Sequence, residues 1–139
     1  MPTTAWRFAG TEGADGAVLK LKALDAQDLI NVQDVTVIRW PEYAGQPTVY
    51  DHVTEQGGMV SALMRKVRRE IIDDSMIETV KTDLMPGTSA VVVLSADAVI
   101  DEVAKAFQGS GMELIRSDLS VPDQDRLRAM IRQAQQGRG

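Results

Sequence analysis

The most hydrophobic stretch of the chain is residues 90–94 (Ala-Val-Val-Val-Leu), which no polar side chain interrupts. Pro86 and Gly87 before it predict a turn, and Ser95 after it suits the N-cap of a helix. A short run that is apolar at every position and rich in β-branched residues is typical of a strand buried on both faces. We therefore expect residues 86–95 to form the turn and central strand of the fold.

Other stretches predict the strands around this one. Their patterns are weak alternation, an abundance of β-branched residues, or alternation of polar and apolar side chains. Pro41 and Pro47 enclose a loop, which lets the strand after it return as a hairpin partner of the strand before it. The predicted strands are residues 5–9, 31–40, 48–53 and 112–117.

Apolar residues three or four positions apart predict the helices. Ser75, followed by Glu78 three positions later, predicts an N-cap with a capping box. Gly10, Gly13 and Gly16 predict a turn, because their spacing is not that of a phosphate-binding loop. The predicted helices are residues 14–29, 59–72, 75–84, 97–108 and 123–135.

This order of elements predicts an α+β fold, a ferredoxin-like split βαβ sandwich. We expect a single domain over residues 1–139, with a helical insertion at 59–84 and a C-terminal helix and tail at 122–139. Right-handed crossovers would place helices 14–29 and 97–108 on one face of an antiparallel sheet. Because the central strand is apolar on both faces, the other face also needs a cover. The candidates are the insertion, the C-terminal helix or a second copy of the chain.

Composition narrows the class of protein. The 139 residues suit one domain, and 44% hydrophobic with 25% charged residues is typical of a globular chain. A net charge of −5 argues against general nucleic-acid binding, and the absence of Cys excludes disulfides and thiolate chemistry. No signal-peptide pattern and no apolar run long enough to cross a membrane is visible. We expect a soluble, cytoplasmic protein.

The candidate ligand site combines His52, the only histidine, with Tyr50 and Trp40. These residues would line a cleft between the sheet and the hairpin of residues 40–53. A zinc site is disfavoured, because the chain offers neither a second His nor a Cys. Ser89 precedes a strand, whereas a nucleophile elbow places its Ser between a strand and a helix. The sequence therefore predicts no catalytic residue, no metal site and no cofactor.

A dense basic cluster lies within the predicted helix 59–72. It consists of Arg65, Lys66, Arg68 and Arg69. It could be the hydrated face of a packed helix, or it could dock on the acidic surface of another protein or of a second copy. A third interpretation is contact with an acidic membrane surface or with nucleic acid, which the overall negative charge disfavours.

Four segments carry a family resemblance: residues 29–38, 52–58 and 84–90, and the region of 114–120. They resemble a family of uncharacterised bacterial proteins that are often described as predicted membrane proteins. The resemblance extends over about residues 19–131 and implies a ferredoxin-like domain, with no catalytic residues to transfer. Family members often carry a glycine-rich apolar hairpin after the position of Gly57 and Gly58, whereas this chain continues into the basic segment. A membrane-spanning hairpin is therefore not implied.

The functional interpretation that the sequence favours is a non-enzymatic structural or interaction module that self-associates into a dimer or a larger homo-oligomer. One alternative is a small dimeric α+β barrel enzyme or small-ligand-binding protein that uses the cleft near His52. Another is a peripheral membrane or scaffold-associated protein that docks through the basic cluster.

Overall fold

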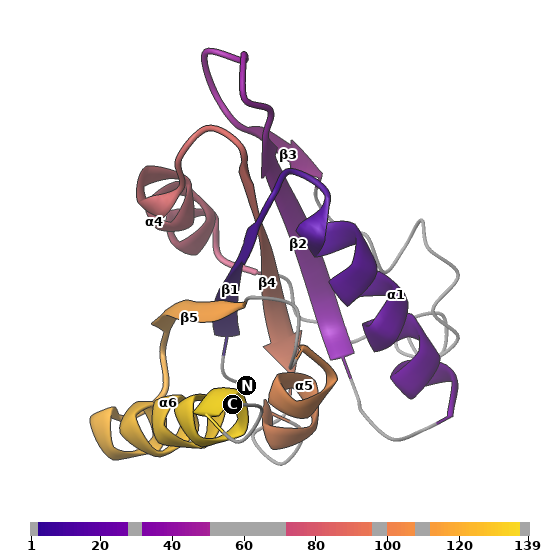
Figure 1. Cartoon of the computed structure of the whole chain (residues 1–139), viewed down its shortest axis with the longest axis vertical. Coiled ribbons are helices and arrows are strands. Elements are labelled where there is room, and N and C mark those ends of the chain that lie inside the picture. The colour runs from indigo at the N-terminus through magenta and orange to yellow at the C-terminus, as the bar shows by residue number, and fades with distance from the viewer. Residues whose placement is uncertain (1–2, 28–31, 51–71, 96–99, 108–111, 137–139) are drawn as a thin grey trace.

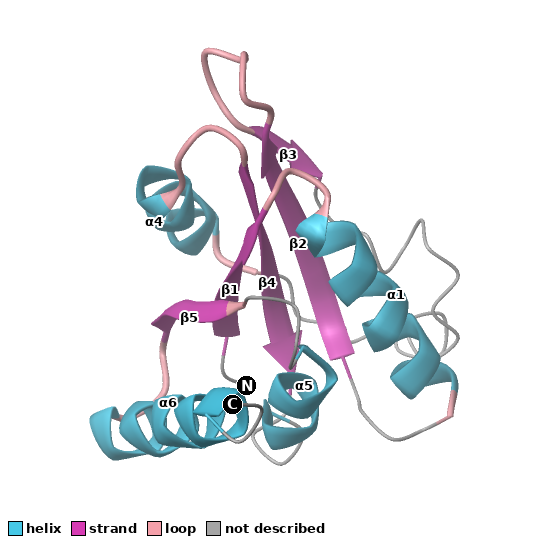
Figure 2. Cartoon of the chain, in the orientation of Figure 1, coloured by secondary structure: helices cyan, strands magenta, loops and turns pink. Residues whose placement is uncertain are grey.

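The computed structural model describes residues 3–27, 32–50, 72–95, 100–107 and 112–136 (Figure 1). The strands are β1 (Thr3–Ala9), β2 (Val32–Trp40), β3 (Thr48–Tyr50), β4 (Thr88–Ser95) and β5 (Glu113–Ser117). The helices are α1 (Gly13–Ala26), α4 (Asp74–Asp83), α5 (Ile100–Phe107) and α6 (Val121–Gln136). Figure 2 shows the strands flanked by these helices.

The five strands form one antiparallel sheet in the order β3-β2-β4-β1-β5. Strand β4 lies in the middle, where Val91 is opposite Trp6 of β1 and Val37 of β2. Without the added strand β3, the order is that of a split βαβ sandwich. The ferredoxin-like fold and the central position of residues 88–95 are therefore confirmed.

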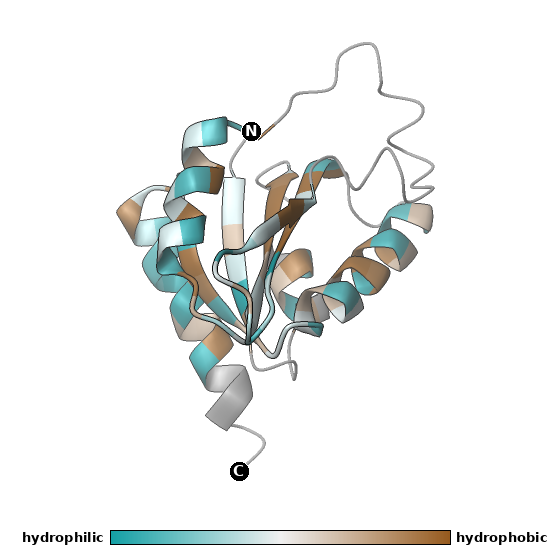
Figure 3. Ribbon diagram, turned by 90° about the horizontal axis from the view of Figure 1, so that it is seen from above, coloured by the Kyte–Doolittle hydropathy of each residue, from teal (hydrophilic) through white to brown (hydrophobic). Residues whose placement is uncertain are grey.

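Helices α1, α5 and α6 cover one face of the sheet. Val91 and Val93 of β4 belong to this core, together with Leu127 of α6. Its aromatic centre is Phe107, whose ring meets those of Trp6 and Phe8 edge-to-face at centroid distances of 5.5 and 5.4 Å. In the view from above, the hydrophobic strand residues lie between the helices (Figure 3).

Helix α4 covers the opposite face. Ala90 and Val92 of β4 pack there in a second core with Ile77 and Val80 of α4. The alternation of side chains along β4 thus explains why every position of residues 90–94 is apolar. Of the covers that the sequence left open, part of the segment 59–84 takes this face, and the C-terminal helix joins the first core instead. A second copy is not needed to cover β4.

Two details of the predicted helices were wrong. Asp73, not Ser75, is the N-cap of α4: its backbone is extended, and its side chain accepts a hydrogen bond from the Ser75 amide at 2.9 Å. Helix α1 begins at Gly13 and ends at Ala26, so that Gly13 and Gly16 are helical, and only Gly10, at a φ of 85°, belongs to the turn. A Cβ on Gly13 would lie 2.6 Å from Cβ of Phe8, so close helix–strand packing requires this glycine.

Several predictions fall outside the described residues. These are nearly all of helix 59–72, including its basic cluster, as well as His52 and the Gly57-Gly58 pair. Within the described part of the chain, no helix has both the length and the apolar character needed to span a bilayer.

Candidate ligand-binding groove

A surface groove lies between α1 and the β2–β3 hairpin, and we call it the α1–β3 groove. Its volume is about 350 Å³. Leu19 and Tyr50 make its apolar part unusually accessible, since they are 66% and 43% exposed. Asp15, Val18, Leu19 and Lys22 of α1 line it, with Val37 and Arg39 of β2 and Tyr50 of β3.

Strand register brings these side chains to one face. Tyr50 lies opposite Val37 in the β2–β3 pair, so both side chains point toward α1. Arg39 follows Val37 by two positions and therefore shares that face. Strand β3 extends the sheet beyond β2, and α1 lies over the neighbouring part of the same face (Figure 1).

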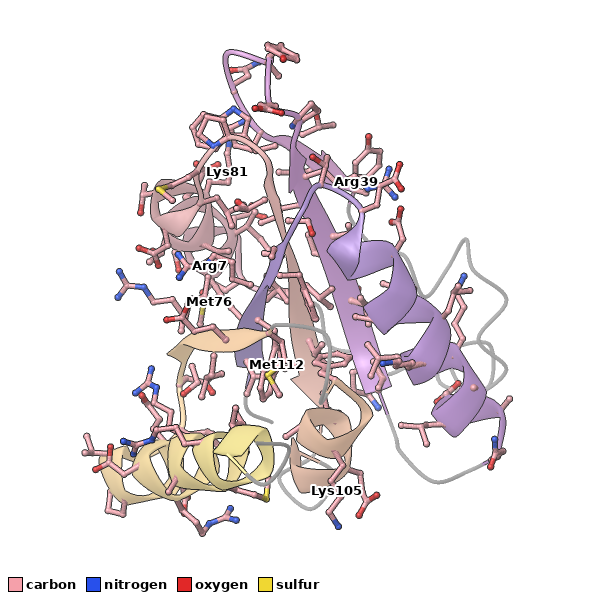
Figure 4. The ribbon with its side chains drawn as sticks, viewed as in Figure 1. Arg7, Arg39, Met76, Lys81, Lys105 and Met112 are labelled. Carbon is pink, nitrogen blue, oxygen red and sulfur yellow. The ribbon has the colours of Figure 1, made fainter. Side chains whose placement is uncertain are left out.

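Arg39 is the central charge of the groove. Figure 4 shows it beside the N-terminal turn of α1. Its guanidinium lies 4.9 Å from the centroid of the Tyr50 ring, in a cation–π arrangement, and one terminal nitrogen forms an ion pair with Asp15. Its Nε is buried and has no hydrogen-bond partner among the residues that the structure describes. The guanidinium is thus held from two sides while a third of the side chain stays exposed (33%).

Two of the predicted cleft residues, Trp40 and Tyr50, do not share a face of the sheet. Trp40 lies on the opposite face of the sheet from Tyr50, packed against the α4 core, with its Nε1 donating to the Ala44 carbonyl at 2.9 Å. His52 lies outside the described residues. Of the three, the structure places only Tyr50 in the groove.

Ser89 has a structural role. Its Oγ accepts a hydrogen bond from the Ala14 amide at 3.0 Å and donates one to the Gly10 carbonyl at 2.9 Å. Glu12, the N-cap residue of α1, makes no side-chain capping bond, so Ser89 of β4 pairs a free amide of the first helical turn. Among the described residues, no three His, Asp or Glu side chains gather as metal ligands would.

The other edge of the sheet also carries arginines, but they are bonded differently. Arg116 of β5 binds Asp83 through two nitrogens, at 2.6 and 3.3 Å, and Arg7 pairs with Glu113. The hydrogen bond that Arg116 donates to Asp83, and then the negative charge of Asp83, raise the pKa of Arg116 above its usual value. Arg128 of α6 donates to the Leu114 carbonyl at 3.4 Å.

The sequence profile of a family described as proteins of unknown function, DUF1269, matches residues 46–132. The chain belongs to the DUF1269 family. The matched range holds β3, α4, β4, α5, β5 and most of α6, whereas both sheet neighbours of β4 precede it. All lining residues of the groove except Tyr50 also precede the DUF1269 match. Comparison with curated proteins and with solved structures finds no match.

Sequence reasoning missed Arg39, Asp15 and Leu19. Arg39 is a lone cation near the end of a strand, and Asp15 resembles the acidic residue common in a first helical turn. Leu19 follows Val18, which faces the core, so it falls off the buried stripe of its helix. An exposed Leu off the stripe was the one available signal, but a single exposed Leu is common on protein surfaces.

Proposed function

We propose that this protein is a non-enzymatic binding module and that it takes a small molecule in the α1–β3 groove. The observation that carries the proposal is the pairing of exposed apolar surface, Leu19 and Tyr50, with an oriented guanidinium, Arg39. Binding sites commonly combine an apolar lining with a few fixed polar groups. The groove has this composition, and the family description leaves the role open.

The test is a screen of the ¹⁵N-labelled full-length protein against a set of small aromatic and aliphatic compounds by NMR. We expect amide shifts that cluster at Val18, Leu19, Arg39 and Tyr50. The variant Leu19→Asp should abolish them, whereas Tyr43→Ser, at another exposed site, should leave them unchanged. Shifts scattered over the surface, or none from any compound, would refute a groove function.

Self-association is a second candidate, and α4 supplies the observation for it. Asp73, Asp74 and Glu78 are exposed on this helix and form an acidic surface. The basic cluster of Arg65, Lys66, Arg68 and Arg69 has the complementary charge for the acidic surface of a second copy. We expect sedimentation to show a dimer or larger species that weakens with salt and that dissociates when the four cations are replaced by Gln. A monomer at every concentration would end this candidate.

A further inference from the structure

We propose that the ligand of the α1–β3 groove is a small monocarboxylate with an apolar body, and that Arg39 holds its carboxylate. This inference rests on the proposed function, because it names the chemistry of the molecule that the same groove takes.

The orientation of Arg39 is set before any ligand arrives. The Tyr50 ring covers the guanidinium at 4.9 Å, and Asp15 pairs with one terminal nitrogen. A guanidinium carries five N–H donors, and among the described residues its only side-chain hydrogen bond is the one to Asp15. Since Nε is covered, the donors left for a ligand are those of the terminal nitrogens.

The charges of the groove favour a ligand with one negative charge. Among the described residues that line it, Arg39 and Lys22 are the cations and Asp15 is the anion, which leaves one positive charge in a chain whose net charge is −5. The Asp15 carboxylate is 42% exposed, so it is partly hydrated and can share the guanidinium with a second carboxylate. The planar guanidinium matches the two oxygens of a carboxylate.

The rest of the groove suits a hydrocarbon or a single aromatic ring. Val18 and Val37 belong to the buried core and form the apolar floor, and Leu19 and Tyr50 contribute exposed apolar surface beside them. A volume of about 350 Å³ is at the lower end of the range for small-molecule sites. The ligand therefore has one charged end and a short apolar body.

The experiment compares three probes of similar shape on the full-length protein: phenylacetate, 2-phenylethanol and 2-phenylethylamine. Dissociation constants come from titrations followed by NMR at the amides of the groove. We expect phenylacetate to bind about tenfold more tightly than either of the others, because only its charge completes the guanidinium site. This comparison needs no variant.

Arg39→Gln should remove the preference for phenylacetate while the weak binding of phenylethanol persists. Arg116→Gln is the matched control, since it breaks an arginine–aspartate pair at the other edge of the sheet. It should leave all three affinities unchanged. Lys22→Gln should weaken phenylacetate less than Arg39→Gln does, because an ammonium lacks the planar two-donor geometry.

Two results would overturn the assignment of a carboxylate. One is equal binding of phenylacetate and phenylethanol in the groove, which would leave the proposed binding function standing. The other comes from a fourth probe, phenyl phosphate, titrated in the same way: binding tighter than that of phenylacetate would assign a phosphate monoester instead. Binding of none of these probes at the groove would remove both the inference and the proposed function.

Discussion

The two edges of the sheet, at β3 and at β5, have similar ion pairs nearby but differ in whether a helix contacts the edge strand. Near each edge an arginine is paired with an acidic residue of another element: Arg39 of β2, next to the edge strand β3, with Asp15, and Arg116 of the edge strand β5 with Asp83. At the β5 edge, Arg128 of α6 binds one strand carbonyl, that of Leu114. At the β3 edge, no described helix lies over the strand, and apolar side chains stay exposed. Similar ion pairs thus accompany an edge that a helix contacts at β5, which we call the closed edge, and a groove with exposed apolar side chains at β3, which we call the open edge.

Removal of residues 1–45 should have the largest effect on stability, because it takes away β1, α1 and β2. The remaining fragment holds nearly all of the family match but lacks β1 and β2, between which β4 pairs. Because both edges of β4 would lose their hydrogen-bonding partners and one face would lose α1, the fragment should not fold. We expect a circular dichroism spectrum without a cooperative thermal transition. A fragment that unfolds cooperatively would show that the family match is an independent domain.

Truncation of one leucine at each edge should separate the closed edge from the open one. Leu127 of α6 is fully buried, whereas Leu19 is mostly exposed. Leu127→Ala should lower the free energy of unfolding by about 2–4 kcal/mol in urea titrations, since it leaves a cavity. Leu19→Ala should change it by less than about 0.5 kcal/mol. Equal losses would mean that the groove is part of the core.

Hydrogen bonds between α6 and the chain at the closed edge can be removed without changing a core residue. Gln124 donates to the Leu119 carbonyl at 3.0 Å, and Arg128 donates to that of Leu114. The double variant Gln124→Ala/Arg128→Ala should lower the free energy of unfolding by about 1–2 kcal/mol. Arg132→Ala, on the same helix and exposed, is the control and should have almost no effect. If the control were as costly, the role of these carbonyl bonds would be disproved.

The smallest effect on stability should come from the ion pairs themselves, yet this comparison is the most informative about function. Arg39→Gln and Arg116→Gln should both unfold close to the wild-type midpoint, because exposed pairs contribute little. Only Arg39→Gln should lose the roughly tenfold preference for phenylacetate. A loss of that preference in Arg116→Gln would show that the carboxylate binds near β5, which contradicts its assignment to Arg39.

Much of the fold could be predicted, because it follows from local patterns. The two-sided apolar character of residues 90–94 identified the central strand, and loop 41–47 predicted the hairpin that became β2 and β3. The helix ends were less accurate. Asp73 and Ser75 are both good N-cap residues, and only the backbone geometry decides between them.

The site could be predicted only in part. Of the residues predicted for one cleft, Tyr50 lines the α1–β3 groove, whereas Trp40 lies on the other face of the sheet. Trp40 and Tyr50 belong to paired strands, and their relative faces depend on the hairpin register. The register pairs Val37 with Tyr50, which brings Arg39 rather than Trp40 to the side of α1.

The sequence by itself determined the α+β class, the order of elements and the need to cover both faces of β4, because each follows from hydrophobic periodicity along a short segment. Tertiary structure alone decided that α4 covers one face and α6 joins the other core. It alone also brought Asp15, Arg39 and Tyr50 together from three elements. The reason is that strand register and helix docking depend on contacts between residues far apart in the chain, which no local pattern records.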